Sequence, residues 1–273
     1  MRNPIIVFIL IVLGWHGLAS CNSAPASDLI GPYAPDRPMP TEGLDTMQVT
    51  FDDVHTWVEN GQFYVVGLAN NLSNDWQQYW LRLTALDAAG QVLTINGKPD
   101  VVVPVMADAV PPRGRSSFFA AIPLDKISGT PADCKLAVAG AKIMDPGPIL
   151  IATEISGVRV LVQNGSDTVQ VEKAWQMRIK VTNPLPLEAQ NPCLESLLYG
   201  RDGKLWFAQT YNPQRDTALI SQSEIGPIPA QGARTFAYNI SYDSLPKGLQ
   251  DAKIRNVEVL CFDRNPGRKD QED

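Results

Sequence analysis

The stretch QVTFDDVHTWVENGQFYVVGL, residues 48–68, decides the fold class of this chain. Two apolar segments, Gln48–Phe51 and Phe63–Leu68, flank the dipeptide Asn60-Gly61. Asparagine and glycine both tolerate positive φ, which a tight hairpin loop requires. The stretch therefore predicts two antiparallel strands that are joined by a turn at Asn60-Gly61.

Short apolar segments separated by turns continue along the chain. After the hairpin, we expect strands at 79–86, 92–93, 101–106, 116–122 and 135–143. Short strands at this spacing are typical of a β-sandwich and not of βαβ units. The sequence therefore predicts an all-β protein.

The pattern then recurs, which indicates an internal duplication. A second hairpin signal, Asn164-Gly165-Ser166, lies between apolar segments at 158–162 and 169–181. A shift of 113 residues places Asn70 on Asn183 and Gly90 on Gly203, and a shift of 118 places Pro111–Gly114 on Pro229–Gly232. We therefore expect two β-sandwich domains in tandem, at 47–145 and 146–263, with the boundary near the Pro- and Gly-rich residues 145–148.

The N-terminal residues have the features of an export signal. Met1-Arg2-Asn3 is a short, positively charged start, and Ile5–Leu13 is an unbroken apolar run. A membrane-spanning helix needs about 20 apolar residues, so this run predicts a signal peptide over residues 1–20.

Leu18-Ala19-Ser20-Cys21, at the end of this signal, resembles the bacterial lipobox. The resemblance implies cleavage after Ser20 and a lipid on Cys21, and acyl chains on one cysteine make a stable membrane anchor. The protein would then be anchored by lipid in the bacterial cell envelope. In a Gram-negative host, Asn22 would direct it to the outer membrane, facing the periplasm. A plain secretory signal with an incidental cysteine is the alternative.

The two ends of the chain differ in composition from the rest. Residues 21–46 contain five prolines and no periodicity, which predicts an extended, semi-rigid tether after the lipidated cysteine. Residues 264–273 form a polar tail that we expect to fray.

The segment Leu83–Gly90 (LTALDAAG), followed by Pro112-Arg113-Gly114 and Phe118, resembles bacterial FxLyD-type domains and small YcfL-type lipoproteins. The resemblance implies an immunoglobulin-like fold for each sandwich and no catalytic residue. The chain departs from the motif at Leu83 and Ala85, and the second copy, with Tyr199-Gly200, lacks the aspartate. The resemblance therefore bears on fold more than on function.

Composition and motifs exclude several classes of function. The chain has 23 Lys and Arg against 29 Asp and Glu, a net charge of −6, and so lacks the basic surface that nucleic-acid binding needs. His55 is the one histidine outside the signal peptide, and no zinc, EF-hand, phosphate-loop or serine-elbow motif is found. We therefore expect no enzyme, no catalytic residue, no metal, no cofactor and no nucleic-acid partner.

Three cysteines, Cys134, Cys193 and Cys261, follow the lipobox. An exported protein can form disulfides, and we expect Cys193 to pair with Cys261 because both lie in the second domain. Three cysteines allow three pairings, and the sequence does not choose among them. Three buried thiols are the alternative.

Aromatic residues are the candidate ligand contacts. Trp76 and Tyr79 follow a polar stretch in the first domain, and Trp206 lies in the second. Exposed rings on a sandwich can stack on sugars or hold a peptide. We expect Trp76 on the surface, whereas Trp80 and Trp206 can instead fill a sandwich core.

These patterns predict a non-catalytic, lipid-anchored envelope protein that binds or scaffolds other proteins. An exposed edge strand can accept a partner's strand through main-chain hydrogen bonds. Three alternatives stay open: a glycan- or peptidoglycan-binding module that uses the exposed aromatic residues, a hydrolase with a site formed only in space, and a structural spacer. The membrane contact would run through the N-terminal lipid.

Overall fold

The structure is a computed structural model, and it describes residues 48–107, 109–144, 150–163, 170–190, 192–211, 227–241, 245–250 and 254–263. The predicted signal peptide, lipidated Cys21, tether, 145–148 boundary, 164–166 turn and polar tail lie outside the described residues. Within these ranges, no helix has the length and apolar character needed to cross a bilayer.

The described residues are almost entirely β-strand. A single turn of 3-10 helix, η3, covers Leu124–Lys126. The strands are β1 (Val49–Glu59), β2 (Gln62–Asn71), β3 (Trp76–Leu86), β4 (Val92–Leu93), β5 (Val101–Pro104), β6 (Arg115–Pro123), β7 (Asp133–Met144), β8 (Ile151–Gln163), β9 (Gln170–Thr182), β10 (Pro192–Gly200), β11 (Leu205–Tyr211), β12 (Ala233–Ser241) and β13 (Ile254–Asp263).

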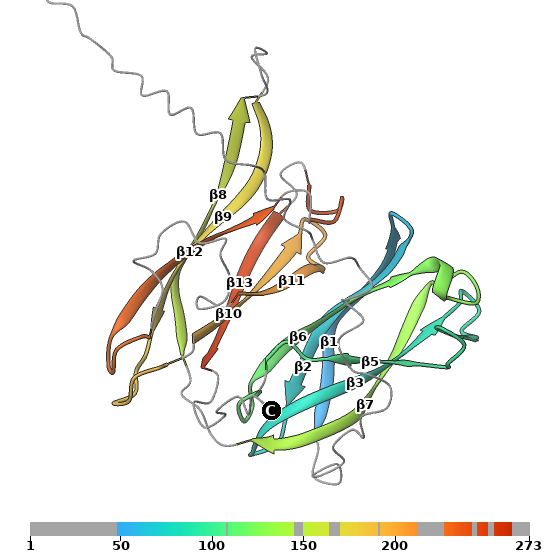
Figure 1. Cartoon of the computed structure of the whole chain (residues 1–273), viewed down its shortest axis with the longest axis horizontal. Helices are drawn as coiled ribbons and strands as arrows, with labels where there is room; N and C mark the ends of the chain where they lie inside the picture. Colours follow the sequence, from blue (N-terminus) through green and yellow to red (C-terminus); the bar gives the residue numbers. More distant parts are fainter. Residues whose placement is uncertain are drawn as a thin grey trace, which may run out of the picture.

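These strands form four antiparallel sheets, which make two β-sandwiches (Figure 1). The first sandwich pairs the sheet β1-β2-β6 with a sheet in which β3 lies between β7 and the short strands β4 and β5. The second pairs β8-β9-β12 with β11-β10-β13. In both, the strands correspond to A, B and E in one sheet and C and F in the other of an immunoglobulin domain. The predicted fold, all-β with two immunoglobulin-like sandwiches, is confirmed.

The turns lie at the Asn and Gly residues that predicted them. Asn60 and Gly61 have φ of 50° and 75° and join β1 to β2, where Glu59 is opposite Gln62. The amide of Gly90 donates to the Asp87 carbonyl and that of Gly203 to the Gly200 carbonyl, each at 3.0 Å, and both glycines have positive φ. The same turn therefore follows the third strand of each sandwich.

The proline-containing turns also match. Gly114 N–H donates to the Pro111 carbonyl at 2.9 Å, and Gly232 N–H donates to the Pro229 carbonyl at 3.0 Å. The residues before these two glycines, Arg113 and Gln231, both have positive φ, as the third position of a type II turn requires. The shift of 118 residues thus relates structurally equivalent turns.

One residue of the predicted alignment is wrong: Asn183 corresponds to Asn71 and not to Asn70. The Nδ2 atoms of Asn71 and Asn183 each donate to three backbone carbonyls within 3.4 Å, and both side chains are fully buried. Asn70 Nδ2 instead donates to Asp52 Oδ2 at 2.7 Å. Adjacent asparagines have the same turn propensity, so a sequence shift did not distinguish them.

Each sandwich encloses its own apolar core, and a third apolar cluster lies between them. Large, fully buried side chains fill the two cores: Phe63, Tyr79, Leu83 and Phe118 in the first and Met177, Ile179, Phe236 and Tyr238 in the second. The third cluster draws on both sandwiches, and its buried members are Val66, Leu68, Leu197, Leu205 and Ala208. The two domains are therefore joined by packed side chains as well as by the chain itself.

Candidate functional site: the contact between the two sandwiches

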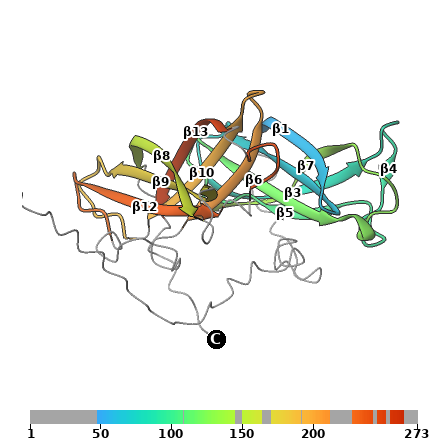
Figure 2. The same cartoon turned by 90° about the horizontal axis from the view of Figure 1, so that it is seen from above.

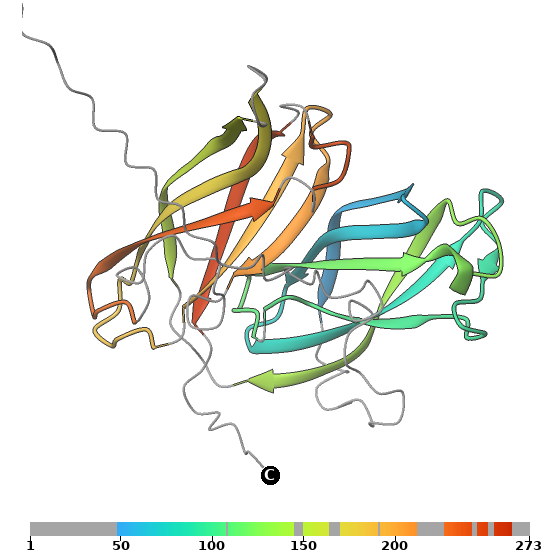
Figure 3. The same cartoon turned by 45° about the horizontal axis from the view of Figure 1, so that its top comes forward.

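The sheet β1-β2-β6 of the first sandwich lies beside the sheet β11-β10-β13 of the second (Figure 2 and Figure 3). Side chains alternate across a strand, so Phe63 and Val65 of β2 enter the first core while Val66 and Leu68 enter the contact. Burial on both faces explains why the apolar run of β2 is continuous. We call this region the inter-sandwich contact.

Aromatic rings from both sandwiches form one connected group in the contact. The Trp57 ring stacks on Tyr64, with centroids 5.0 Å apart and an angle of 11° between the planes. The Trp206 ring of the second sandwich has its centroid 5.1 Å from that of Trp57 and 4.3 Å from that of His55, and the Trp206 and His55 rings are nearly perpendicular. Such ring pairs add to the free energy gained by burying their area.

His55, the one histidine outside the predicted signal peptide, is part of this contact. Its Nδ1 lies 3.1 Å from the Leu205 carbonyl oxygen, so Nδ1 carries the proton and donates across the contact. Burial lowers the pKa of His55, and the Leu205 carbonyl offsets this only in part. The histidine is therefore neutral at pH 7 and serves as a hydrogen-bond donor between the sandwiches.

Two glycines make room for Trp206. A Cβ atom on Gly200 would lie 2.9 Å from the Trp206 ring, and one on Gly248 would lie 2.7 Å from it. The Trp206 Nε1 donates to the Asp202 carboxylate at 3.1 Å. The half-buried ring is therefore fixed against His55 and Trp57, and it fills the contact instead of lying open on the rim.

A carboxylate lies at the centre of the contact. Glu195 projects from β10 toward the first sandwich and is fully buried. The Ser116 hydroxyl donates to Glu195 Oε2 at 2.8 Å, and the Ser117 N–H donates to Oε1. Ser116 Oγ in turn accepts from the Ala107 N–H at 2.9 Å. Burial raises the pKa of Glu195, and the hydrogen bonds from Ser117 and Ser116 counteract that rise.

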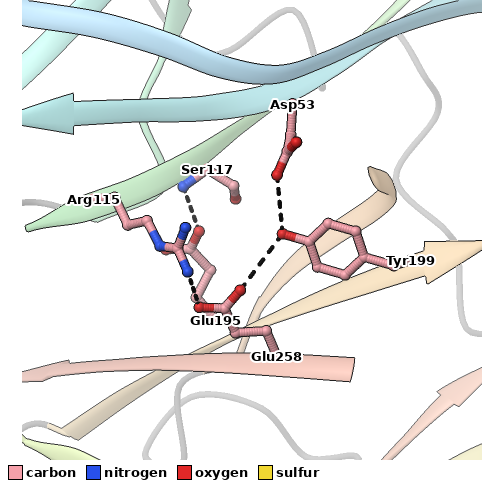
Figure 4. A network of polar contacts seen from close by, with 6 residues as sticks. All are labelled: Asp53, Arg115, Ser117, Glu195, Tyr199 and Glu258. Carbon is pink, nitrogen blue, oxygen red and sulfur yellow. Dashed lines mark hydrogen bonds and ion pairs between the residues drawn. The ribbon is translucent and has the colours of Figure 1, made fainter. Parts of the chain in front are cut away.

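Partly exposed polar groups surround the buried carboxylate (Figure 4). Arg115 of β6 pairs with Glu258 of β13 across the contact. The Tyr199 hydroxyl lies 3.4 Å from Asp53 Oδ2 and 3.5 Å from Glu258 Oε2. Burial, followed by these two carboxylates, raises the pKa of Tyr199. The rim of the contact is therefore held by charged and hydroxyl groups from both sandwiches.

The prediction that Trp76 and Tyr79 are exposed ligand contacts is wrong. Trp76 is 9% exposed and Tyr79 is 1% exposed, because Tyr79 points into the first core and Trp76 packs where β3 begins. Trp80 is buried as well. The glycan-binding alternative required exposed rings, and only Trp206 among its three is partly accessible. Burial of Tyr79 raises its pKa.

The register of β10 against β13 argues against the predicted disulfide. Cys193 is opposite Phe262, and Cys261 is opposite Leu194. The two thiols therefore point to opposite faces of the sheet, and they belong to different clusters. Cys193–Cys261 pairing stays a prediction that this geometry does not favour.

The Cys134 and Cys261 thiols are poor nucleophiles. Burial raises the pKa of Cys134 to about 12, with Asp133 contributing, and it raises the pKa of Cys261 to about 12, with Glu195 contributing. A thiol with such a pKa stays protonated at neutral pH and is a poor nucleophile. Among the described residues, no group of three or more His, Cys, Asp or Glu is placed to hold a metal ion.

Glu195, His55 and Trp57 were not predicted from the sequence to lie together. An isolated sandwich exposes the outer faces of its sheets to water, so a glutamate on such a face is expected to be solvated. One signal was available: β2 lacks the polar alternation that an exposed face imposes. That continuous run indicates a second buried face.

Comparisons with known proteins assign no family. No family model matches this chain, and no curated protein matches it. Among solved structures, the chain is similar to red sea bream transglutaminase, with 14% sequence identity and a TM-score of 0.23. The match covers 80% of this chain and 29% of that one, so this chain spans under a third of that protein's length. At this identity and TM-score the similarity carries no argument about activity.

Proposed function

We propose that this chain is a non-catalytic, lipid-anchored protein of the bacterial cell envelope that binds or scaffolds other proteins. The observation that carries the proposal is that the side chains best suited to catalysis instead form buried hydrogen bonds or pack as protonated thiols. His55 donates to a backbone carbonyl, Glu195 accepts from two buried donors, and Cys134 and Cys261 have strongly raised pKa values. None of these groups faces a reacting partner in the described part of the chain.

An edge strand supplies the binding mechanism. In an immunoglobulin domain, a further strand, G, lies beside strand F. Strand F of the first sandwich is β7, and within the described ranges its main-chain pairing is with β3. Lys135, Ala137 and Ile143 are exposed along it. A partner strand added there would gain main-chain hydrogen bonds, and its side chains would confer specificity.

Anchoring is tested by replacing the cysteine of the lipobox. Full-length protein should fractionate with membranes, and Cys21→Ser should abolish both the lipid and the membrane association, because the acyl chains provide the anchor. Cys134→Ser is the matched control, since it changes a thiol that lies in the folded part. A Cys21→Ser variant that still fractionates with membranes would contradict the anchor.

Protein binding is tested at the edge of β7. A photoreactive phenylalanine analogue at Ala137 should crosslink a second protein in cells of the source organism. The same analogue at Ala89, in the exposed turn after β3, is the matched control and should give no such product. Equal crosslinking at the two positions would contradict strand addition at β7.

A further inference from the structure

A loop on the second sandwich, held by hydrogen bonds to its own backbone, presents two leucines to solvent. The loop follows β9 and reads NPLPLEAQ over residues 183–190. Asn183 holds it from inside: Nδ2 donates to the Leu187 carbonyl at 2.6 Å, and Oδ1 accepts from the Leu185 N–H at 3.1 Å. Even so, the Leu187 side chain is 73% exposed and that of Leu185 is 37% exposed.

The equivalent loop of the first sandwich has polar residues at the same places. Asn71 Nδ2 donates to the Asp75 carbonyl at 2.8 Å, and its Oδ1 accepts from the Ser73 N–H at 3.0 Å. Asp75 therefore corresponds to Leu187, and Ser73 corresponds to Leu185. The loop forms with polar side chains in the first copy, so folding does not explain the leucines in the second.

A third exposed apolar residue lies at the same end of the second sandwich. Ile151 of β8 is opposite Thr182, the last residue of β9, and it is 48% exposed. Asp53 and Glu154, which both have positive φ, lie in equivalent bulges of β1 and β8. Thr50 and Ile151 each lie three residues before the bulge residue, so these two positions are equivalent. Apolar residues thus replace polar ones at three equivalent positions. We call Ile151, Leu185 and Leu187 the leucine tip.

We infer that the leucine tip is a docking surface for a protein that receives these side chains in an apolar pocket. The inference rests on the proposed function, and it names the chemistry that the partner must offer. Buried apolar anchors in a pocket supply most of the binding free energy in such contacts. Glu188, next to Leu187, is exposed and would favour a basic or amide group at the rim of the pocket.

The size and charge of the tip favour this occupant. The exposed fractions of the three side chains add up to less than two whole residues, whereas each partner in a stable interface buries about 800 Å². Two copies meeting tip to tip would bury little more than these side chains, whereas a pocket that encloses the tip also covers the residues around it. An anionic bilayer is disfavoured because residues 183–190 contain a glutamate and no lysine or arginine, and the chain is acidic overall.

Photocrosslinking from position 187 tests the inference. The photoreactive phenylalanine analogue is placed at Leu187 of the full-length chain in cells of the source organism, where it preserves the apolar character of the tip. A discrete protein adduct is expected, and its yield should fall at least tenfold when Leu185→Ser and Ile151→Thr are added. The analogue at Asp75, the equivalent position of the first sandwich, should not form this adduct.

The identified partner then allows a quantitative measurement. The purified partner should bind the Leu187→Asp variant at least tenfold more weakly than the unmodified protein. The thermal midpoint should stay unchanged, because aspartate occupies the equivalent place in the first sandwich.

Several outcomes would overturn the inference: no adduct, an equal adduct from Asp75, an adduct with phospholipid only, or an adduct of twice the chain's own mass. If position 187 fails while Ala137 on β7 captures a protein, the leucine tip is not the docking surface and the proposed function stands.

Discussion

Replacing Glu195 tests whether its carboxylate holds the two sandwiches together. Glu195→Ala removes the acceptor of hydrogen bonds from the Ser116 hydroxyl and the Ser117 N–H, in a fully buried setting. Each buried donor left without a partner costs about 1–3 kcal/mol, so the loss of both acceptors should lower the free energy of unfolding by about 2–6 kcal/mol.

Glu195→Gln separates hydrogen bonding from ionisation. Glutamine keeps a carbonyl oxygen as acceptor, so its stability near pH 5 should be within about 1 kcal/mol of the unmodified protein. Burial raises the pKa of Glu195, so the folded chain retains a proton that the unfolded chain releases above about pH 4.3. The contribution of Glu195 to stability therefore decreases as pH rises from there through the raised pKa, by at most about 1.4 kcal/mol per pH unit. Glu195→Gln should lack this decrease.

Urea unfolding of the full chain in detergent, followed by tryptophan fluorescence from about pH 4.5 to about pH 8, measures both effects. Glu258→Gln is the matched control, because this carboxylate lies at the rim of the same contact and is partly exposed. The reasoning is refuted if Glu195→Ala changes stability by less than about 0.5 kcal/mol, or if Glu195→Gln and the unmodified protein have parallel pH profiles.

Four other expectations follow from the structure. Because burial lowers the pKa of His55, its contribution to stability should decrease as pH falls below about 6.5, so the thermal midpoints of the unmodified protein and His55→Gln should change relative to each other below that pH. Trp206→Ala should cost about 2–4 kcal/mol and increase the radius of gyration measured by X-ray scattering; an unchanged scattering profile would contradict its role in the contact. Asn183→Ala removes the donor to three carbonyl oxygens and should cost about 2–4 kcal/mol in urea unfolding, whereas a cost below about 1 kcal/mol would argue that the loop is held otherwise. Cys134 and Cys261 should resist a thiol reagent at about pH 8 until the chain unfolds, and rapid labelling of the native protein would count against their raised pKa values.

Much of the fold could be predicted because turns have a local chemical signature. Asn60-Gly61 and Gly90 need positive φ, and few residue types provide it, so these positions were readable from the sequence. The one-residue error at Asn70 arose because hydrogen bonds to distant carbonyls, and not local propensity, distinguish Asn71 from its neighbour.

The candidate site was largely out of reach because it depends on how two domains pack. Trp76 lies among polar residues in the sequence, yet it is buried where β3 begins. Glu195 is a charged residue in the middle of a strand, and only the neighbouring sandwich removes it from water. Local pattern reports which face of a strand is apolar, but it does not report what covers the other face.

The contact joins faces that are not equivalent in the two copies: the A-B-E sheet of the first sandwich meets the C-F sheet of the second. Such a head-to-tail arrangement could in principle continue into a row of further copies. The second sandwich ends the row, because Gln176, Arg178 and Lys180 of β9 occupy the places that Tyr64, Val66 and Leu68 occupy on β2. These polar side chains are comparable to the polar outer face that terminal units of repeat proteins carry, where the chain meets solvent instead of another repeat.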